Sequence, residues 1–332
     1  MINGKTILIT GGTGTFGQKF TEYIFANYKP KKVIIFSRDE FKHYKMSQTF
    51  PEGKYPIRYF IGDIRDKGRL LRAFEGVDLV VHAAAMKHVP ACEYNPFEAV
   101  RTNIIGAQNI AEAALDKNVE KVVILSTDKA VSPVNLYGAT KLSMEKIFIA
   151  SESLVGNKNT IFSLVRYGNV VGSRGSVIPF FLELKKKGVK EYPITDDRMT
   201  RFWISIEEGV KLVIHALENG QGGEIFIPKI PSMKMTDLVK VIDPEAGIKH
   251  IGIRPGEKLH ETLVSNEEAR HTVDIGKYYV ILPEFVFRKD QTAKYDKMNK
   301  LGYEFSYSSD NNDEWIDGED LKKLITQKFG EF

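Results

Sequence analysis

The chain has 332 residues, of which 42% are hydrophobic and 27% are charged, proportions that are ordinary for a globular protein. Its 47 basic and 43 acidic residues leave a net charge of only +4, so we expect no nucleic-acid partner. The single cysteine, Cys92, excludes an intramolecular disulfide and fits a reducing compartment. No stretch reaches the roughly 18 uninterrupted apolar residues of a membrane span, and residues 1–5 carry no signal-peptide pattern. We therefore expect a soluble cytoplasmic protein without a membrane partner.

Short apolar runs alternate with helical patterns in the first half of the chain. Residues Thr6–Thr10 predict a buried strand, and Phe16, Phe20 and Ile24 then recur every four residues on one helix face. Short β-rich runs separated by helices are typical of a parallel sheet covered on both faces. The predicted fold class is therefore α/β, a Rossmann-type doubly wound parallel sheet with a smaller C-terminal substrate-binding lobe. The further strands that support it are expected at Lys32–Ser37, Ile57–Ile61, Asp78–His82, Lys121–Ser126 and Glu224–Pro228.

A glycine-rich segment, Gly11-Gly12-Thr13-Gly14-Thr15-Phe16-Gly17, follows the first strand and opens the first helix. It satisfies both G-x-G-x-x-G and G-x-x-G-x-x-G spacings. Glycines allow a tight turn and a close backbone approach to a pyrophosphate, and a helix N-terminus offers N–H groups and a positive dipole end. The segment predicts a dinucleotide cofactor, with Gly11, Gly14, Thr15, Phe16 and Gly17 as candidate ligands.

The end of the second strand bears on which nicotinamide cofactor binds. NAD enzymes usually carry an acidic residue there, whereas this strand ends in Ser37 and Arg38. Arg38 can hold a 2′-phosphate, which favours NADP, but Asp39 follows directly and leaves NAD possible. Asp63 is either a ligand of the adenine amine or a helix-cap or turn residue. Ser37, Asp63, Ile64 and the small Ala83 complete the predicted cofactor site.

These features divide the chain into three parts. We expect residues 1–170 to form the NADP-binding domain, with a strand and a helix returning to it near 204–228. The alternation of strands and helices ends near residue 170, so 171–290 is expected to be mainly the substrate-binding lobe. Residues 291–332 are polar and form a C-terminal extension, which either wraps the surface or makes a subunit contact.

A second constellation follows the strand at Lys121–Ser126. Thr127, Asp128 and Lys129 come directly after it, and Tyr137 and Lys141 lie four residues apart on one face of the next helix. The pKa of free tyrosine is about 10. A neighbouring ammonium and an oxidised nicotinamide both favour the phenolate. Tyr137 can then remove a hydroxyl proton while hydride leaves the same carbon.

Motifs spread from residue 6 to about residue 260 carry a family resemblance. They are Thr10–Gly17, Ser37–Glu40, Ala83–Pro90, Ser126–Lys129, Leu136–Lys141, Arg166–Gly175, Met199–Ile204, Ile227–Met235 and Ile253–His260. With these motifs the chain resembles the extended short-chain dehydrogenases/reductases. More narrowly, it is similar to the inverting UDP-N-acetylglucosamine 4,6-dehydratases that open pseudaminic acid and related deoxysugar pathways.

The resemblance implies a reaction in which Tyr137 and NADP oxidise the C4 hydroxyl of the sugar to a ketone. Lys129 then removes the acidified C5 proton, Asp128 protonates the departing C6 hydroxyl, hydride returns to C6, and a proton returns to C5. Retaining relatives carry an Asp-Glu pair after Thr127, so lysine in the second position implies inversion at C5. Lys129 must be neutral to act as a base. We expect burial, Lys141 and the nicotinamide to lower its pKa, and Asp128 to oppose them.

The resemblance also implies a UDP-sugar site. Lys87 would approach the sugar or the diphosphate, and Asn169 would hold the nucleotide. Arg201 and Arg254 would take the phosphates or ribose, for which the planar guanidinium is suited, and Glu257 a ribose hydroxyl. Extended members usually pair through helices, so we expect a homo-oligomer.

Alternatives stay open at this stage. A UDP-sugar 4-epimerase or a reductase needs the Tyr137–Lys141 pair but no acid and base at Asp128 and Lys129. Lys129 is otherwise a surface lysine or an ion pair with Asp128. A non-enzymatic NADP-binding protein is the other class. No His or Cys spacing is typical of a metal site, so we expect no metal.

Overall fold

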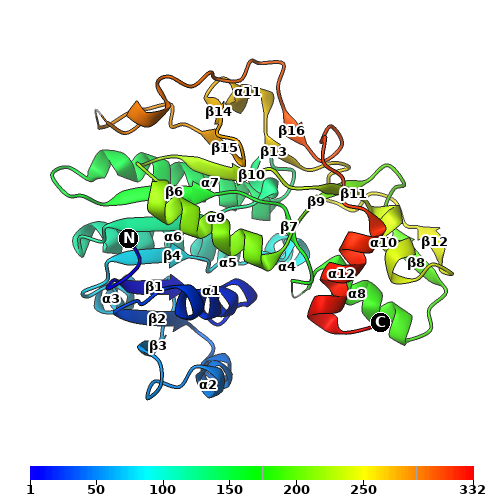
Figure 1. Ribbon diagram of the computed structural model, residues 1–332, viewed down its shortest axis with the longest axis horizontal. Helices are drawn as coiled ribbons and strands as arrows, with labels where there is room; N and C mark the ends of the chain where they lie inside the picture. The colour runs from blue at the N-terminus through cyan, green and yellow to red at the C-terminus, as the bar shows by residue number, and fades with distance from the viewer. Residues whose placement is uncertain (174, 289) are drawn as a thin grey trace.

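The centre of the protein is one large twisted sheet (Figure 1). The computed structural model describes residues 1–173, 175–288 and 290–332. The strand order is β14-β15-β10-β6-β5-β4-β1-β2-β3, and the strands from β10 to β3 are parallel, while β15 and β14 are antiparallel additions at one edge. The strands are β1 (Thr6–Thr10), β2 (Lys32–Ser37), β3 (Ile57–Ile61), β4 (Leu79–His82), β5 (Lys121–Leu125), β6 (Ile161–Val165), β10 (Ile225–Pro228), β14 (Thr272–Asp274) and β15 (Tyr278–Ile281).

Helices cover both faces of this sheet, which confirms the predicted doubly wound α/β fold. α1 (Thr15–Asn27) packs beside α9 (Ile206–Asn219) on one face, and α3 (Lys67–Ala73), α6 (Gly106–Asp116) and α7 (Leu136–Ser151) lie side by side on the other (Figure 1). The remaining helical segments around the sheet are α2 (Glu40–Thr49), α4 (Val89–Tyr94), α5 (Pro96–Val100), the π-helical turn η1 (Arg101–Ile105), and the 3₁₀ turns η2 (Asp128–Ala130), η3 (Glu152–Leu154) and η4 (Ala293–Tyr295).

Helix α7 starts where the sequence offers a cap. The Asn135 side chain accepts a hydrogen bond from the backbone N–H of Gly138, which satisfies one of the free donors of the first turn. A Cβ atom at Gly138 would lie 2.1 Å from the carbonyl oxygen of Lys129. Glycine at this position therefore lets the first turn of α7, which carries Tyr137, pack directly on η2.

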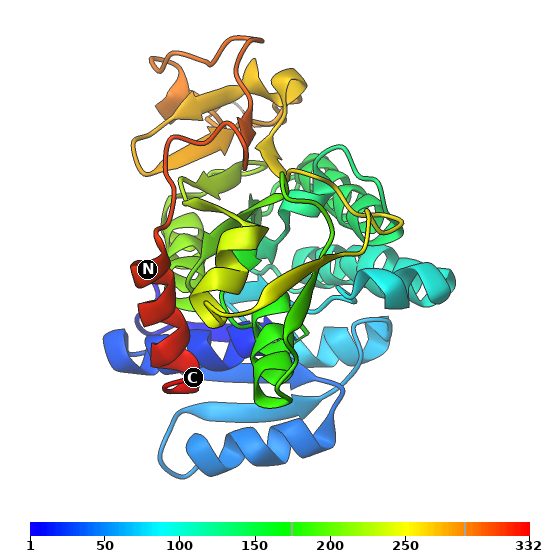
Figure 2. The same cartoon turned by 90° about the vertical axis from the view of Figure 1, so that its right-hand side faces the viewer.

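A second, smaller core lies at one end of the sheet, where α8 (Val177–Lys186), α10 (Met235–Ile242) and α12 (Gly318–Phe329) pack together (Figure 2). Trp203, Phe181 and Leu321 are buried in it. The C-terminal residues thus add a helix to this lobe and a strand, β16 (Tyr307–Ser308), beside β13 (Thr262–Val264). The other elements are β7 (Asn169–Val170), β8 (Glu191–Ile194), β9 (Thr200–Ile204), β11 (Ser232–Lys234), β12 (Gly247–His250) and α11 (Asn266–Ala269).

A fully buried arginine joins the sheet to its neighbours. The Arg166 guanidinium, just after β6, pairs with Glu145 of α7 at 2.7 Å and with Glu268 of α11 at 3.0 Å. It also donates to the carbonyl oxygen of Leu263 at 2.9 Å, and the Ser126 hydroxyl donates to Glu145. A buried charge is tolerated only when it is paired and hydrogen-bonded, so this cluster fixes the relative positions of β5, β6, α7 and α11.

Glu145→Gln should therefore lower the free energy of unfolding by about 3 kcal/mol, because it removes one of the two charges that compensate Arg166. Denaturant unfolding followed by circular dichroism measures this change. Glu183→Gln is the control, since Glu183 pairs with Lys187 on an exposed helix face and its loss should leave the midpoint almost unchanged. Equal midpoints for the two variants would contradict the role given to Arg166.

Among the described residues, no helix has both the length and the apolar character needed to cross a bilayer.

Candidate active site

Two adjoining cavities lie at the carboxyl edge of the parallel strands, where ligands of doubly wound sheets bind. The inner cavity, of about 730 Å³, is lined by residues that follow β1 to β6. The outer cavity, of about 630 Å³, lies between the sheet and the second lobe. His88, Asn169, Gly175 and Ser176 line both cavities, so a ligand in one can contact a ligand in the other.

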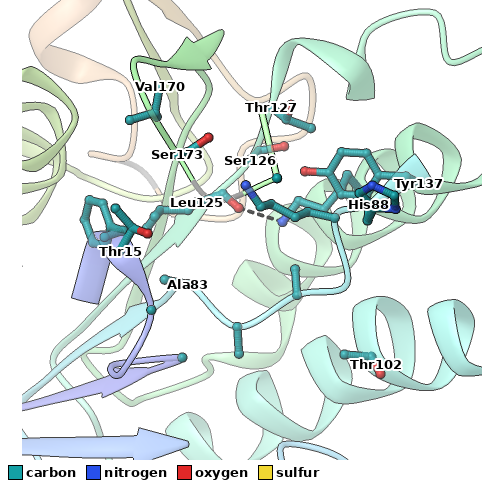
Figure 3. A pocket seen from close by; sticks show the side chains of 18 of the residues that line it. Thr15, Ala83, His88, Thr102, Leu125, Ser126, Thr127, Tyr137, Val170 and Ser173 are labelled. Atoms are coloured by element: carbon teal, nitrogen blue, oxygen red, sulfur yellow. Dashed lines mark hydrogen bonds between the residues drawn. The ribbon is translucent and has the colours of Figure 1, made fainter. Parts of the chain in front are cut away.

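The predicted glycine loop forms one end of the inner cavity. α1 begins at Thr15 (Figure 3) and Gly14 is its N-cap residue. A Cβ atom at Gly17 would lie 2.3 Å from the carbonyl oxygen of Gly12, so only glycine lets the helix approach the loop this closely. Gly11, Gly14, Thr15, Phe16 and Ala83 all line the cavity, with the N-terminus of α1 facing it. This cradle fits the pyrophosphate of a dinucleotide.

The residues predicted to contact the adenosine half also line the inner cavity. The Ser37 and Thr13 hydroxyl groups share a hydrogen bond of 2.8 Å, which fixes the loop against the end of β2. The Arg38 side chain is 60% exposed, and its guanidinium lies 3.6 Å from the Asp63 carboxylate. Asp63 and Ile64 line the cavity, and Asp63 also pairs with Arg65 at 2.7 Å.

Asp39, the acidic residue that complicated the choice of cofactor, has a structural role. Its side chain caps α2 by accepting from the backbone N–H of Lys42, and it pairs with the Lys42 ammonium at 2.7 Å. Both interactions hold the pKa of Asp39 below its usual value. The carboxylate is therefore engaged by its own helix, whereas Arg38 lies at the cavity.

The predicted catalytic residues converge at the other end of the inner cavity. Thr127, Lys129, Tyr137 and Lys141 all line it, and Figure 3 shows Thr127 and Tyr137 close together. His88 lines the same cavity. The Asp128 side chain is 1% exposed and accepts hydrogen bonds from the Thr127 hydroxyl at 2.8 Å and from Lys129 at 3.1 Å. Asp128 thus lies beneath two residues that reach the cavity.

The electrostatics of Tyr137 differ from the expectation. Burial raises its pKa to about 12, while Lys129 and Thr127 act in the opposite direction. The ammonium of Lys129 is therefore one that favours the phenolate. Burial lowers the pKa of Lys141 to about 8, with Glu145 opposing, and its ammonium donates to the carbonyl oxygen of Leu125 at 2.6 Å.

The expectation that Lys129 has a lowered pKa is wrong for the protein by itself. Burial alone would lower it, but Asp128 and a second carboxylate, Glu261, outweigh burial and raise the pKa above its usual value. A carboxylate oxygen of Glu261 lies 3.1 Å from the Lys129 ammonium. Glu261 is the residue directly before β13. No sequence spacing links Glu261 to Lys129, although it directly follows the Ile253–His260 motif.

The predicted substrate residues are divided between the two cavities. Lys87 lines the inner one, and desolvation followed by Lys129 lowers its pKa. Asn169, on β7, lines both. Arg254 and Glu257 line the outer cavity together, and Glu257 accepts from the Thr195 hydroxyl at 3.1 Å.

Arg201 also lines the outer cavity, but part of its guanidinium is occupied. It donates to the backbone carbonyl oxygens of Thr200, Lys258 and Leu259. Arg201 therefore faces the cavity and also holds the segment that carries Arg254 and Glu257 against β9.

Sequence reasoning missed one further residue that shapes the site. The Asn103 amide, in the π-helical turn η1, bonds to both backbone groups of Met86 and to the Thr140 hydroxyl. It fixes the segment after β4, which carries Lys87 and His88, against α7. An asparagine directly before two isoleucines, Ile104 and Ile105, was the available signal, but asparagine alone does not reveal its partner.

Among the residues that the structure describes, no cluster of three or more histidine, cysteine, aspartate or glutamate side chains could hold a metal ion.

Comparison with known proteins places this geometry in a family. The family of polysaccharide biosynthesis proteins matches residues 7–283, which include the residues lining both cavities. The chain belongs to this family. The family resemblance predicted from the motifs is confirmed. Arg174, which lies in one of those motifs, is outside the described residues.

Relatives and a solved structure extend this match. The UDP-N-acetylglucosamine 4,6-dehydratase (inverting) of Campylobacter jejuni subsp. jejuni serotype O:23/36 (strain 81-176) is 54% identical over 336 residues, covering 99% of this chain and 100% of that protein. The UDP-glucose 4-epimerase of Rickettsia canadensis (strain McKiel) is 45% identical over 289 residues, covering 85% and 84%. The X-ray structure of Pen from Bacillus thuringiensis superposes with a TM-score of 0.89 at 39% identity, covering 99% of both chains.

Gly17→Ala should weaken binding of the dinucleotide cofactor by roughly tenfold or more, about 1.4 kcal/mol, because the added methyl group forces α1 away from Gly12. Titration of cofactor fluorescence measures the affinity. Gly209→Ala is the matched control, since Gly209 is also helical and its Cβ would meet nothing within 4 Å. Unchanged affinity in Gly17→Ala would show that this loop does not hold the cofactor.

Proposed function

We propose that this protein is a UDP-N-acetylglucosamine 4,6-dehydratase that inverts C5, a hydro-lyase of nucleotide-sugar biosynthesis for surface glycans such as those built on pseudaminic acid. Its product is UDP-2-acetamido-2,6-dideoxy-hexos-4-ulose. The observation that carries the proposal is the Asp128–Lys129 pair beside Tyr137 at the inner cavity. An acid and a base next to the oxidising tyrosine are what water elimination needs and what epimerisation does not.

The cofactor in this proposal is NADP. Gly11 and Gly14 would cradle its pyrophosphate, while Gly17, which packs on Gly12, would let α1 approach it. Arg38, with its guanidinium at the rim, would hold the 2′-phosphate. When bound, the nicotinamide supplies reversible hydride transfer, which converts the C4 hydroxyl to a ketone and later completes the C6 methyl group. The capping role of Asp39 supports NADP over NAD.

Tyr137 takes the proton of the C4 hydroxyl in the first step. The raised pKa of Tyr137 means that the phenolate needs a positive charge nearby, which Lys129 and the bound nicotinamide supply. Lys141, one turn further along α7, is held by the Leu125 carbonyl oxygen. It orients the site and, with a pKa of about 8, can exchange protons near neutral pH.

Lys129 and Asp128 carry out the elimination. Lys129 removes the C5 proton, the electron pair of that bond forms the C5–C6 double bond, and the C6–oxygen bond breaks. Asp128 gives its proton to the departing hydroxyl, which leaves as water. Because Asp128 is buried, the Thr127 hydroxyl that donates to it lies between this acid and the cavity and would relay the proton.

The UDP part of the substrate would occupy the outer cavity. Arg254 and Arg201 would bind phosphate or ribose, and Glu257 a ribose hydroxyl, with Asn169 and Lys87 at the junction to the sugar. We also propose a cytoplasmic homo-oligomer. The exposure of Tyr94 at 87% and Phe97 at 77%, on helices packed beside α7, supports a subunit contact there.

A second candidate is a UDP-sugar 4-epimerase, which the relative from Rickettsia canadensis favours. That reaction uses Tyr137 and the same cofactor but returns hydride to C4 without loss of water.

Incubating the purified protein with UDP-N-acetylglucosamine separates the two candidates. The dehydratase should give a product lighter by one water, with a new C6 methyl signal in proton NMR spectra and deuterium at C5 in deuterated water. Coupling constants should show the inverted configuration at C5. An isomer of unchanged mass would support the epimerase and reject the dehydratase.

Arg38→Ala should raise the dissociation constant of NADP by roughly 10- to 100-fold, the range expected for losing a charge-assisted hydrogen bond. The dissociation constant of NAD should stay the same and serves as the internal control. Fluorescence titration with both reduced cofactors measures the two constants. An equal loss of affinity for NADP and NAD would mean that Arg38 does not bind the 2′-phosphate.

A further inference from the structure

Lys129 stands between two buried carboxylates. Its ammonium lies 3.1 Å from Asp128 and 3.1 Å from Glu261. The Lys129 side chain is 24% exposed and reaches the cavity, whereas the side chains of Asp128 and Glu261 are 1% and 3% exposed. Of these three residues, Lys129 is the one whose own side chain lines the cavity.

Each of these two carboxylates has one oxygen atom that accepts no hydrogen bond. Asp128 Oδ2 and Glu261 Oε2 are buried and have no hydrogen-bond partner among the described residues. A buried carboxylate oxygen without a donor is costly. Such an oxygen can, however, accept a proton.

The backbone of Glu261 is held firmly from the other side. Its N–H donates to the Ser309 hydroxyl at 2.9 Å, and the Ser309 N–H donates to the Glu261 carbonyl oxygen at 2.8 Å. The same hydroxyl bonds to Thr200 at the start of β9. Through Ser309, the polar C-terminal extension therefore positions Glu261 against Lys129.

We propose that Glu261 is a positioning residue of the elimination step, which holds the Lys129 amine at the cavity and remains its counter-ion when Asp128 carries a proton. The inference rests on the proposed function. Transfer of a proton from Lys129 to Asp128 creates a neutral amine and a carboxylic acid together, the base and the acid that the reaction uses. After Lys129 has taken the C5 proton and before Asp128 has released its own, Glu261 is the carboxylate that compensates the charge of Lys129.

The charge on Lys129 depends on all groups around it, and Glu261 and Asp128 are the anions among them. The cations that oppose them come from other elements: Arg201 on β9, which lies 3.8 Å from Glu261, Lys258 in the loop before β13, and Lys87 after β4, with the neutral Tyr137 on α7 beside them. Removing Glu261 leaves Asp128 alone against these cations, so the pKa of Lys129 must fall.

The test measures the pKa of the Lys129 amine directly and needs no turnover of substrate. Brief labelling with acetic anhydride at a series of pH values, read by peptide mass spectrometry, gives the pKa of this amine. In Glu261→Gln it should drop by about one to three pH units relative to the wild type. Glu261→Asp keeps the charge but withdraws it by one carbon, so it should give an intermediate value. The control is Glu152→Gln, since Glu152 is equally buried but pairs with Arg288.

The pH dependence of product formation is the second readout. If Lys129 is the base, the rising limb of the rate should move to lower pH in Glu261→Gln, because a lower pKa gives more neutral amine at each pH. A purely structural residue would lower the rate equally at all pH values. If Glu261→Gln does not fold, the titration of Glu261→Asp decides.

The outcomes separate this inference from the proposed function. A wild-type pKa for Lys129 in Glu261→Gln, or in Glu261→Asp if only that variant folds, would overturn the inference even if the wild type dehydrates its substrate. A lowered pKa in a protein whose wild type forms no dehydrated product would support the place of Glu261 and reject the dehydratase.

Discussion

The pairing of Arg166 with Glu145 and Glu268 is the interaction on which the rest of the site depends. A guanidinium without solvent contact at the end of β6 must be surrounded by fixed partners. One partner, Glu145, lies on α7, which also carries Tyr137. The other partner, Glu268, lies on α11, which follows β13, the strand directly after Glu261. One buried charge thus sets the distance between Tyr137 and the segment that contacts Lys129.

This arrangement gives each end of the inner cavity a different chemistry. The glycine loop and the N-terminus of α1 offer backbone donors to an anion, while the far end concentrates titratable side chains in a buried, low-dielectric setting. Perturbed pKa values of Tyr137, Lys129 and Lys141 occur together there, a pattern typical of acid–base sites. The outer cavity then adds guanidinium groups suited to a diphosphate.

The sequence predicted the features whose cause is local. Thr6–Thr10, Lys32–Ser37 and Ile57–Ile61 form strands with those bounds, because each is a short apolar run ending in a turn. Tyr137 and Lys141 share a helix, so their spacing was enough. Glu261 could not be found in this way, because it meets Lys129 only through the packing of the segment at β13 against η2, which lies far away in the chain. The pKa of Lys129 was predicted in the wrong direction for the same reason.

The most direct test of the whole account follows one atom through the reaction. UDP-N-acetylglucosamine carrying deuterium at C4 is converted by the protein with unlabelled cofactor, and the position of the deuterium in the product is read by NMR. The account predicts that the deuterium appears in the C6 methyl group, because one site removes it from C4 and returns it to C6 while Asp128 and Lys129 eliminate water. Deuterium found again at C4, or lost to the cofactor pool, would contradict it.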